Sequence, residues 1–144
     1  MGLSECASAL LLLSTGLMQT TTPKELVLVT GSSGLIGART ADRLSAQFRV
    51  AGLDRPGEPH PPSSADNIPC DLTSDDSVVQ ALTMVKGRFG SDIAAVVHLA
   101  AYFDFSGEPS SKYSEVTVEG TRRLLRALHA LGFRVARFIF SSTM

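Results

Sequence analysis

Cysteine is scarce in this chain of 144 residues, which contains only Cys6 and Cys70. Two cysteines are too few for a disulfide scaffold, and neither stands at metal-ligand spacing from the three histidines. We therefore expect a reducing, cytoplasmic compartment. An excess of charge of one sign is lacking too, since the net charge is -1 and the pI about 6.3. The sequence offers no broad basic field, so neither nucleic acid nor a membrane is expected as a partner.

A hydrophobic run long enough to cross a bilayer is also lacking. Residues 7–18 are apolar around Leu10 to Leu13, a length that suits the core of a signal peptide but not a membrane span. Glu5 precedes this stretch and no Lys or Arg does, so a secretory signal is the less favoured of two alternatives. We expect residues 1–23 to form a poorly ordered leader and the fold to occupy residues 24–144.

What the sequence does contain, from Glu25 onward, is short apolar runs alternating with helix-length amphipathic runs. This alternation is typical of strand-helix-strand units. It predicts strands at 26–29, 48–53, 67–70, 93–97 and 137–140. It predicts helices at 34–46, from Ser74, and at 112–130. Right-handed crossovers would place these helices on both faces of one sheet.

The fold class is therefore predicted to be α/β: a doubly wound, mostly parallel sheet, or Rossmann fold. We expect the strand order 3-2-1-4-5, with the chain ending after the fifth strand and a ligand crevice above strands one and four.

Within the first helix, Leu35, Ile36, Ala38, Ala41 and Leu44 are available for an inner face. In the long helix, Glu119 and Arg123 are spaced for an ion pair. Phe103 and Phe105 are expected to pack beneath a loop.

The strongest local pattern lies between the first strand and the first helix, at Thr30-Gly31-Ser32-Ser33-Gly34-Leu35-Ile36-Gly37. Gly31 and Gly34 permit a tight turn in which backbone amides approach a pyrophosphate, and Gly37 allows helix and strand to touch. The first two glycines are one residue further apart than in the familiar G-x-G-x-x-G. The structural alternative is a turn followed by close packing.

Asp54 ends the second predicted strand, 17 residues after Gly37 by the numbering. A carboxylate at this point can accept both hydroxyls of an adenosine ribose and would repel a 2'-phosphate, which favours NAD over NADP. Arg55 weakens that preference because a guanidinium could pair with a phosphate. Asp54 could instead be only a turn residue before the proline-rich loop.

Together these residues resemble the extended short-chain dehydrogenase/reductase family, the NAD-dependent epimerase/dehydratase group, over about residues 25–144. Three later stretches match in order. Asp71-Leu72 resembles the adenine-contacting pair, and His98-Leu99-Ala100-Ala101 resembles the segment under the ribose and nicotinamide. Thr117-Val118-Glu119-Gly120-Thr121 resembles N-x-x-G-T, with Thr117 in place of the usual Asn. His98 could equally be a core imidazole.

The resemblance implies an NAD-binding domain of an oxidoreductase that transfers hydride from a secondary alcohol or sugar nucleotide. The cofactor-binding positions would be Gly31, Ser33, Gly34, Leu35, Ile36, Gly37, Asp54, Arg55, Asp71, Leu72, Leu99, Ala100, Ala101 and Thr117. Thr143 would be the catalytic Ser/Thr that hydrogen-bonds the substrate. The family also dimerises through the helix at 112–130, so a homodimer is a candidate assembly.

The family's proton-transferring Tyr and its Lys, spaced Y-x-x-x-K, have no counterpart here. The tyrosines are Tyr102 and Tyr113, and Lys follows neither four positions later. Without that pair the general base is absent, so we expect this chain on its own to be inactive. The alternative function is a non-catalytic dinucleotide-binding module that regulates or senses redox state.

Overall fold

The computed structural model describes residues 23–58, 60–104 and 109–141. The predicted leader at residues 1–23 lies outside these ranges except for its last residue, Pro23, and Thr143 lies outside them as well. None of the helices within the described ranges combines the length and apolar character needed to cross a lipid bilayer.

A parallel five-stranded sheet forms the centre of the fold, in the order β3-β2-β1-β5-β7. Because β5 and β7 are the fourth and fifth predicted strands, the predicted order and the doubly wound fold class are confirmed. The register aligns Thr30 with both Leu53 and His98, so the strands finish at one common edge. The strands are β1 Leu26–Thr30, β2 Arg49–Asp54, β3 Asp66–Pro69, β5 Ala95–His98 and β7 Phe138–Phe140.

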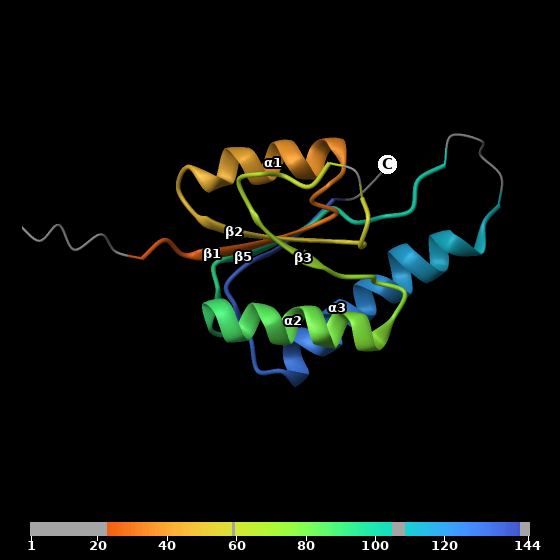
Figure 1. Ribbon diagram of the computed structural model, residues 1–144. Coiled ribbons are helices and arrows are strands. Elements are labelled where there is room, and N and C mark those ends of the chain that lie inside the picture. Colours follow the sequence, from red (N-terminus) through yellow and green to blue (C-terminus); the bar gives the residue numbers. More distant parts are fainter. Residues whose placement is uncertain (1–22, 59, 105–108, 142–144) are drawn as a thin grey trace, which may run out of the picture.

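Helices cover both faces of this sheet (Figure 1). Helix α1, Leu35–Ser45, lies on one face, and α2, Asp75–Phe89, with α3, Gly120–Ala130, lies on the other. The larger hydrophobic cluster fills the α2–α3 side and includes Leu28, Leu82 and Leu124. The smaller cluster lies under α1. Both faces of β1 are therefore buried, as a central parallel strand requires.

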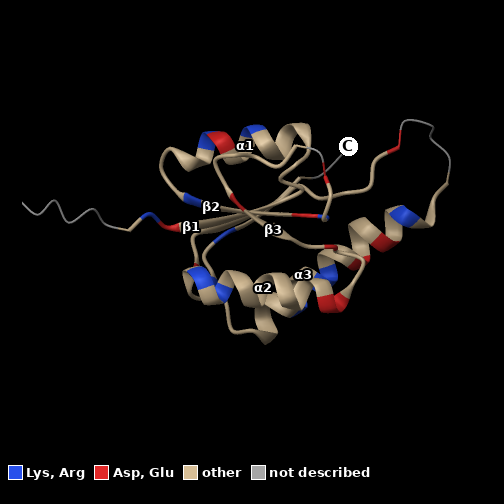
Figure 2. Ribbon diagram, in the orientation of Figure 1, with Lys and Arg blue, Asp and Glu red and all other residues tan. Residues whose placement is uncertain are grey.

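Helix α2 begins as the sequence predicts. The hydroxyl of Ser74 accepts a hydrogen bond from the backbone N–H of Ser77 at 3.2 Å. Acidic residues occupy the first turn and basic residues the last, an asymmetry that Figure 2 shows along the helix. These charges oppose the helix dipole at both ends and stabilise α2.

The fourth predicted strand is divided in two, and the fifth, β7, begins one residue later than predicted. Ala94 interrupts the fourth, leaving β4, Asp92–Ile93, separate from β5, and its N–H donates to the carbonyl of Leu26. Strand β6, Arg134–Val135, pairs with β4 in a small second sheet. Arg134 forms an ion pair with Asp92 across this pairing. The sequence analysis did not predict β6.

The predicted inner face of α1 is partly wrong. Leu35 and Ile36 are 80% and 69% exposed, whereas Gly37 is buried against the turn at Gly31 and Ser32 and Ala41 against the sheet. The reason is the close approach of α1 to the preceding turn, which admits only small residues on the inward face and turns the two larger side chains outward.

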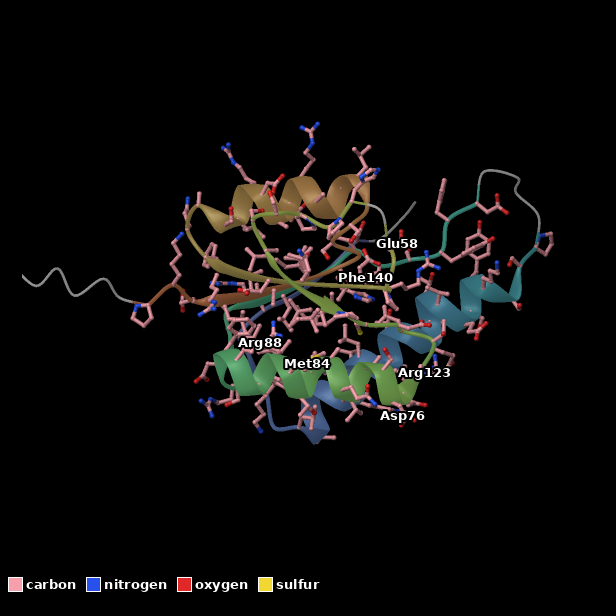
Figure 3. The ribbon with its side chains drawn as sticks, viewed as in Figure 1. Glu58, Asp76, Met84, Arg88, Arg123 and Phe140 are labelled. Carbon is pink, nitrogen blue, oxygen red and sulfur yellow. The ribbon has the colours of Figure 1, made fainter. Side chains whose placement is uncertain are left out.

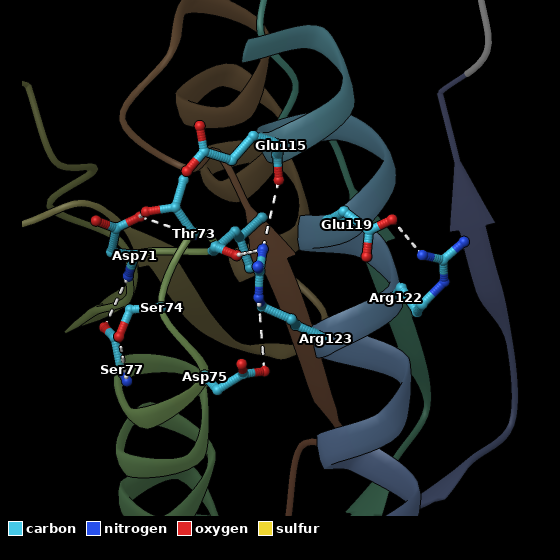
Figure 4. Close-up of polar contacts among 10 residues, drawn as sticks. Asp71, Thr73, Ser74, Asp75, Ser77, Glu115, Glu119, Arg122 and Arg123 are labelled. Atoms are coloured by element: carbon cyan, nitrogen blue, oxygen red, sulfur yellow. Dashed lines mark hydrogen bonds and ion pairs between the residues drawn. The ribbon is translucent and has the colours of Figure 1, made fainter. Parts of the chain in front are cut away.

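The long helix also differs from its prediction. Its first part, η1 Tyr113–Glu119, is a π-helix in which the N–H of Gly120 donates to the carbonyl of Glu115, five residues back. Glu119 pairs with Arg122 rather than with Arg123. Figure 4 shows Arg123 directed instead toward Asp75 and the carbonyl of Glu115. The guanidinium of Arg123 also donates to the carbonyl of Leu72. Arg123 therefore joins the long helix to the start of α2.

Candidate nucleotide-binding site

A cleft of about 650 Å³ opens at the carboxyl-terminal edge of the sheet, above β1, β2 and β5. Its volume lies within the roughly 300–1,000 Å³ range of small-molecule sites. It brings together nine of the predicted cofactor residues: Gly31, Gly34, Asp54, Arg55, Asp71, Leu72, Leu99, Ala100 and Ala101. A crevice at this edge, between strands whose crossovers run in opposite directions, is where doubly wound sheets bind ligands.

The glycine turn forms the floor of the cleft. Gly31 has φ of +69°, and a Cβ there would lie 2.9 Å from the backbone nitrogen of Ala100. Gly34 precedes α1 without a side-chain cap hydrogen bond. The amides of the first helical turn, at Leu35 and Ile36, are among those that have no acceptor within the helix itself. An anion can therefore bind close to the N-terminus of α1.

Asp54 is fixed to the same turn. Its Oδ2 accepts the backbone N–H of Ser33 and its Oδ1 accepts the backbone N–H of Arg55, each at 2.8 Å. Both bonds leave the carboxylate beside the glycine turn and on the lining of the cleft. A carboxylate in this position can accept hydrogen bonds from the hydroxyls of a ribose.

Arg55 does not extend freely from the end of β2. Its guanidinium forms an ion pair with the carboxylate of Glu58, across the turn at Pro56 and Gly57. Glu58 is labelled in Figure 3, on the loop that follows β2. Sequence reasoning treated this region only as a surface loop and did not select Glu58.

Asp71 and Leu72 form the opposite wall of the cleft. The Oδ1 of Asp71 accepts both the backbone N–H and the hydroxyl of Thr73. These two hydrogen bonds, the backbone one first, hold the pKa of Asp71 below its usual value, and Arg55 and Arg123 lower it further. Leu72 is buried, and a Cβ on Gly120 would lie 3.0 Å from the Leu72 Cβ. The glycine of the long helix therefore lets that helix pack against this wall.

His98 directly precedes the Leu99–Tyr102 segment, which forms the third wall of the cleft, but His98 itself does not line the cleft. This residue is 1% exposed, and its Nδ1 lies 2.7 Å from the Thr30 hydroxyl and its Nε2 2.8 Å from the Thr121 hydroxyl. Because the Thr121 hydroxyl donates to the Thr117 carbonyl, its oxygen accepts the Nε2 proton. Nδ1 then accepts from Thr30, and the imidazole is neutral with both nitrogens satisfied. The core interpretation of His98 is the one that the contacts support.

The Thr30 oxygen also accepts the backbone N–H groups of Leu99 and Ala100, each at 3.2 Å. Thr117 does not line the cleft: its hydroxyl accepts the backbone N–H of Tyr102 at 3.1 Å. The predicted cofactor residue Thr117 therefore positions the segment from Leu99 to Tyr102, which itself faces the cleft.

Several predicted residues lie away from the cleft lining. Ser33 reaches it only through Asp54, Gly37 is buried behind the turn, and the side chains of Leu35 and Ile36 face outward. The predicted packing of Phe103 beneath a loop is wrong, because this ring is 70% exposed and lines the cleft. Phe105 lies outside the described residues.

Some of the lining residues that the sequence analysis did not select come from the segments after β2 and β5 and from the start of the long helix. No local motif marks them, but the predicted crevice at the strand ends could have directed attention to the loops that follow each strand. These residues are Glu58, Tyr102, Lys112, Glu115 and Val116. Within the described ranges, no group of three or more His, Cys, Asp or Glu is placed to hold a metal ion.

Cys70 is predicted to be unreactive in the folded protein. Burial, followed by the charges of Asp71 and Asp54, raises the pKa of the thiol to about 12. At pH 8 we expect its reaction with a disulfide reagent to be about a thousandfold slower than after unfolding in urea. The measurement uses Cys6→Ser protein, so that only Cys70 reports. Equal rates in the folded and unfolded protein would contradict the burial of this thiol.

Comparison with known proteins agrees with this geometry. Residues 27–144 match the model of the NAD dependent epimerase/dehydratase family. A curated relative from Escherichia coli O157:H7, an N-acetyl-alpha-D-glucosaminyl-diphospho-ditrans,octacis-undecaprenol 4-epimerase, is 32% identical over 118 residues. The match covers 82% of this chain and 32% of the relative.

Two solved structures share the fold. The UDP-glucose 4-epimerase of Thermus thermophilus, in complex with NAD, is 28% identical with a TM-score of 0.65, over 82% of this chain and 37% of that protein. The uronate dehydrogenase of Agrobacterium tumefaciens, 23% identical, has a TM-score of 0.61 over 83% of this chain and 41% of its own. The chain therefore belongs to the NAD-dependent epimerase/dehydratase family of extended short-chain dehydrogenases/reductases.

Proposed function

We propose that this chain binds NAD in the cleft and supplies the cofactor-binding part of an oxidoreductase that acts on a secondary alcohol or sugar nucleotide. The observation that carries the proposal is the meeting of Gly31, Gly34, Asp54 and Asp71 around one cleft of about 650 Å³. When bound, NAD supplies the acceptor for a hydride. The chain spans 32% of its curated relative, so substrate and activity are proposed for the whole protein.

The residues of the cleft fit a dinucleotide. A Cβ on Gly31 would collide with the backbone of Leu99 and Ala100. The amides of Gly31, Ser33 and Gly34 already donate within the fold, so the amides of Leu35 and Ile36 at the start of α1 would receive a pyrophosphate. Asp54 would hold the hydroxyls of the adenosine ribose, and Asp71 with Leu72 would receive the adenine. Leu99 to Ala101 would lie against the ribose and nicotinamide. Thr143 would orient the substrate oxygen.

Asp54→Ala is expected to weaken NADH binding about 10- to 100-fold, because it removes charge-assisted hydrogen bonds worth about 1.5–3 kcal/mol. The measurement is calorimetric titration of the full chain with NADH, NADPH and FMN. Asp76→Ala is the control, since Asp76 is exposed on α2 and does not line the cleft. Unchanged NADH affinity in Asp54→Ala would refute the role of Asp54. Tighter binding of FMN than of NADH would favour a mononucleotide site instead.

A further inference from the structure

The turn after β2 carries two opposite charges on the lining of the cleft. In Arg55-Pro56-Gly57-Glu58 the proline occupies the second position and Gly57, with φ of +86°, the third. This combination is typical of a type II turn, which brings its first and fourth residues together. The ion pair between Arg55 and Glu58 follows from that geometry. It joins the Arg55 side chain, 67% exposed, to a Glu58 side chain that is only 28% exposed.

We propose that Glu58 determines the preference between NAD and NADP by occupying Arg55. This inference rests on the proposed function, because it assigns the specificity of the same cleft. Arg55 is the only arginine among the described residues that line the cleft. A guanidinium there would pair with a 2'-phosphate in the bidentate manner that makes Arg–phosphate contacts strong. With Glu58 in place, the guanidinium already has a carboxylate partner.

The charge of the cleft acts in the same direction. The charged residues of the lining are Asp54, Glu58, Asp71 and Glu115 against Arg55 and Lys112. Acidic groups therefore outnumber basic ones, and an added phosphate is repelled. The influence of Arg55 reaches across the cleft, where its positive charge contributes to the lowered pKa of Asp71. Removing the charge of Glu58 both releases the guanidinium and reduces the repulsion.

A small hollow beside this pair offers space for the phosphate. Its volume is about 150 Å³, and Ser32, Asp54, Arg55, Glu58 and Asn67 contribute to its lining. The Oγ of Ser32 is buried and has no hydrogen-bond partner among the described residues. Ser32 and Arg55 line the same hollow, so this hydroxyl without a partner is a candidate second donor for a phosphate oxygen. The hollow therefore offers the hydrogen-bond donors that a 2'-phosphate requires.

The test compares NADH and NADPH binding by the full chain and its variants. In Glu58→Gln we expect the NADPH dissociation constant to fall about tenfold, while that of NADH changes by no more than about twofold. The double variant Arg55→Gln/Glu58→Gln is expected to lose the gain. Glu115→Gln is matched for charge: it removes one carboxylate from the same lining without touching Arg55.

Each outcome decides the inference. If Glu58→Gln leaves the ratio of the two dissociation constants unchanged, or if the double variant keeps the gain, Glu58 does not act through Arg55. A gain of the same size in Glu115→Gln would assign the effect to net charge and overturn the inference. Binding of NADH with an unchanged ratio leaves the proposed function intact. Binding of neither dinucleotide by the wild type or any variant would overturn both.

Discussion

Gly37→Ala is expected to destabilise the fold by about 3 kcal/mol or more and to abolish dinucleotide binding. A Cβ on Gly37 would overlap the Gly31 carbonyl oxygen and would lie 2.8 Å from the Gly31 carbonyl carbon and 2.9 Å from the Ser32 Cα. All three atoms belong to backbone, so no side chain can move aside. Helix α1 would have to shift away from the glycine turn that forms the floor of the cleft.

Gly87→Ala provides the matched control for this substitution. Gly87 lies inside α2, and a Cβ there meets nothing within 4 Å. Alanine should therefore stabilise the protein by about 0.5–1 kcal/mol through helix propensity. Thermal unfolding, monitored by far-UV circular dichroism, measures the stability of both variants. The two substitutions should shift the unfolding midpoint in opposite directions. A Gly37→Ala midpoint close to that of the wild type would show that the contact between α1 and the turn is not rigid.

The packing at Gly37 also explains why the inner face of α1 was mispredicted. Apolar residues that recur at helical spacing mark the buried face of a helix only when the helix lies far enough from its neighbours for large side chains to fit between them. Here Gly37 and Ala41 bring the backbone of α1 close to the turn, and Leu35 and Ile36 are turned outward. The glycine pattern contained that information, but the hydrophobic pattern outweighed it.

The sequence predicted the residues that line the cleft best at the ends of the strands. Asp54 and Asp71 could be placed because each directly follows a predicted buried strand, and parallel strands finish at one edge. Glu58 and the π-helical turn of η1 could not. They depend on contacts made after folding: the Arg55 ion pair across a turn, and the bonds of Thr117 with Tyr102 and of Tyr113 with Asp104.

We expect His98 to reduce the free energy of unfolding as the pH is lowered from about 6.5 to about 4. Burial lowers the pKa of its imidazole from 6.5 to about 4. The unfolded chain thus takes up the proton near pH 6.5 and the folded protein only near pH 4. Above pH 6.5 both states are neutral and the contribution is constant. At pH 4 the free energy of unfolding should be lower by about 3 kcal/mol than at pH 7.5.

The hydrogen bonds around the ring act in the same direction as its burial. Nδ1 accepts from the Thr30 hydroxyl, whose oxygen already accepts the N–H groups of Leu99 and Ala100. A proton on Nδ1 would face that hydroxyl proton and force it to turn. The surrounding rings of Phe138 and Phe140, with centroids 5.7 and 6.0 Å away, offer no acceptor for it.

Urea unfolding at steps from pH 7.5 to 4.5 tests this prediction. His98→Phe should cost about 3 kcal/mol at pH 7.5, because it leaves the buried hydroxyl of Thr30 and the partly buried hydroxyl of Thr121 without their ring partner. The stability of this variant should then vary little down to pH 4.5. His129→Gln, at an exposed residue of α3, should retain the pH dependence of the wild type. The lowered pKa of Asp71 acts below this window, since its contribution is lost only as pH falls past the usual value of that carboxyl. A fall that persists in His98→Phe would therefore show that another group titrates there, and that the Thr30–His98–Thr121 contacts tolerate a charged ring.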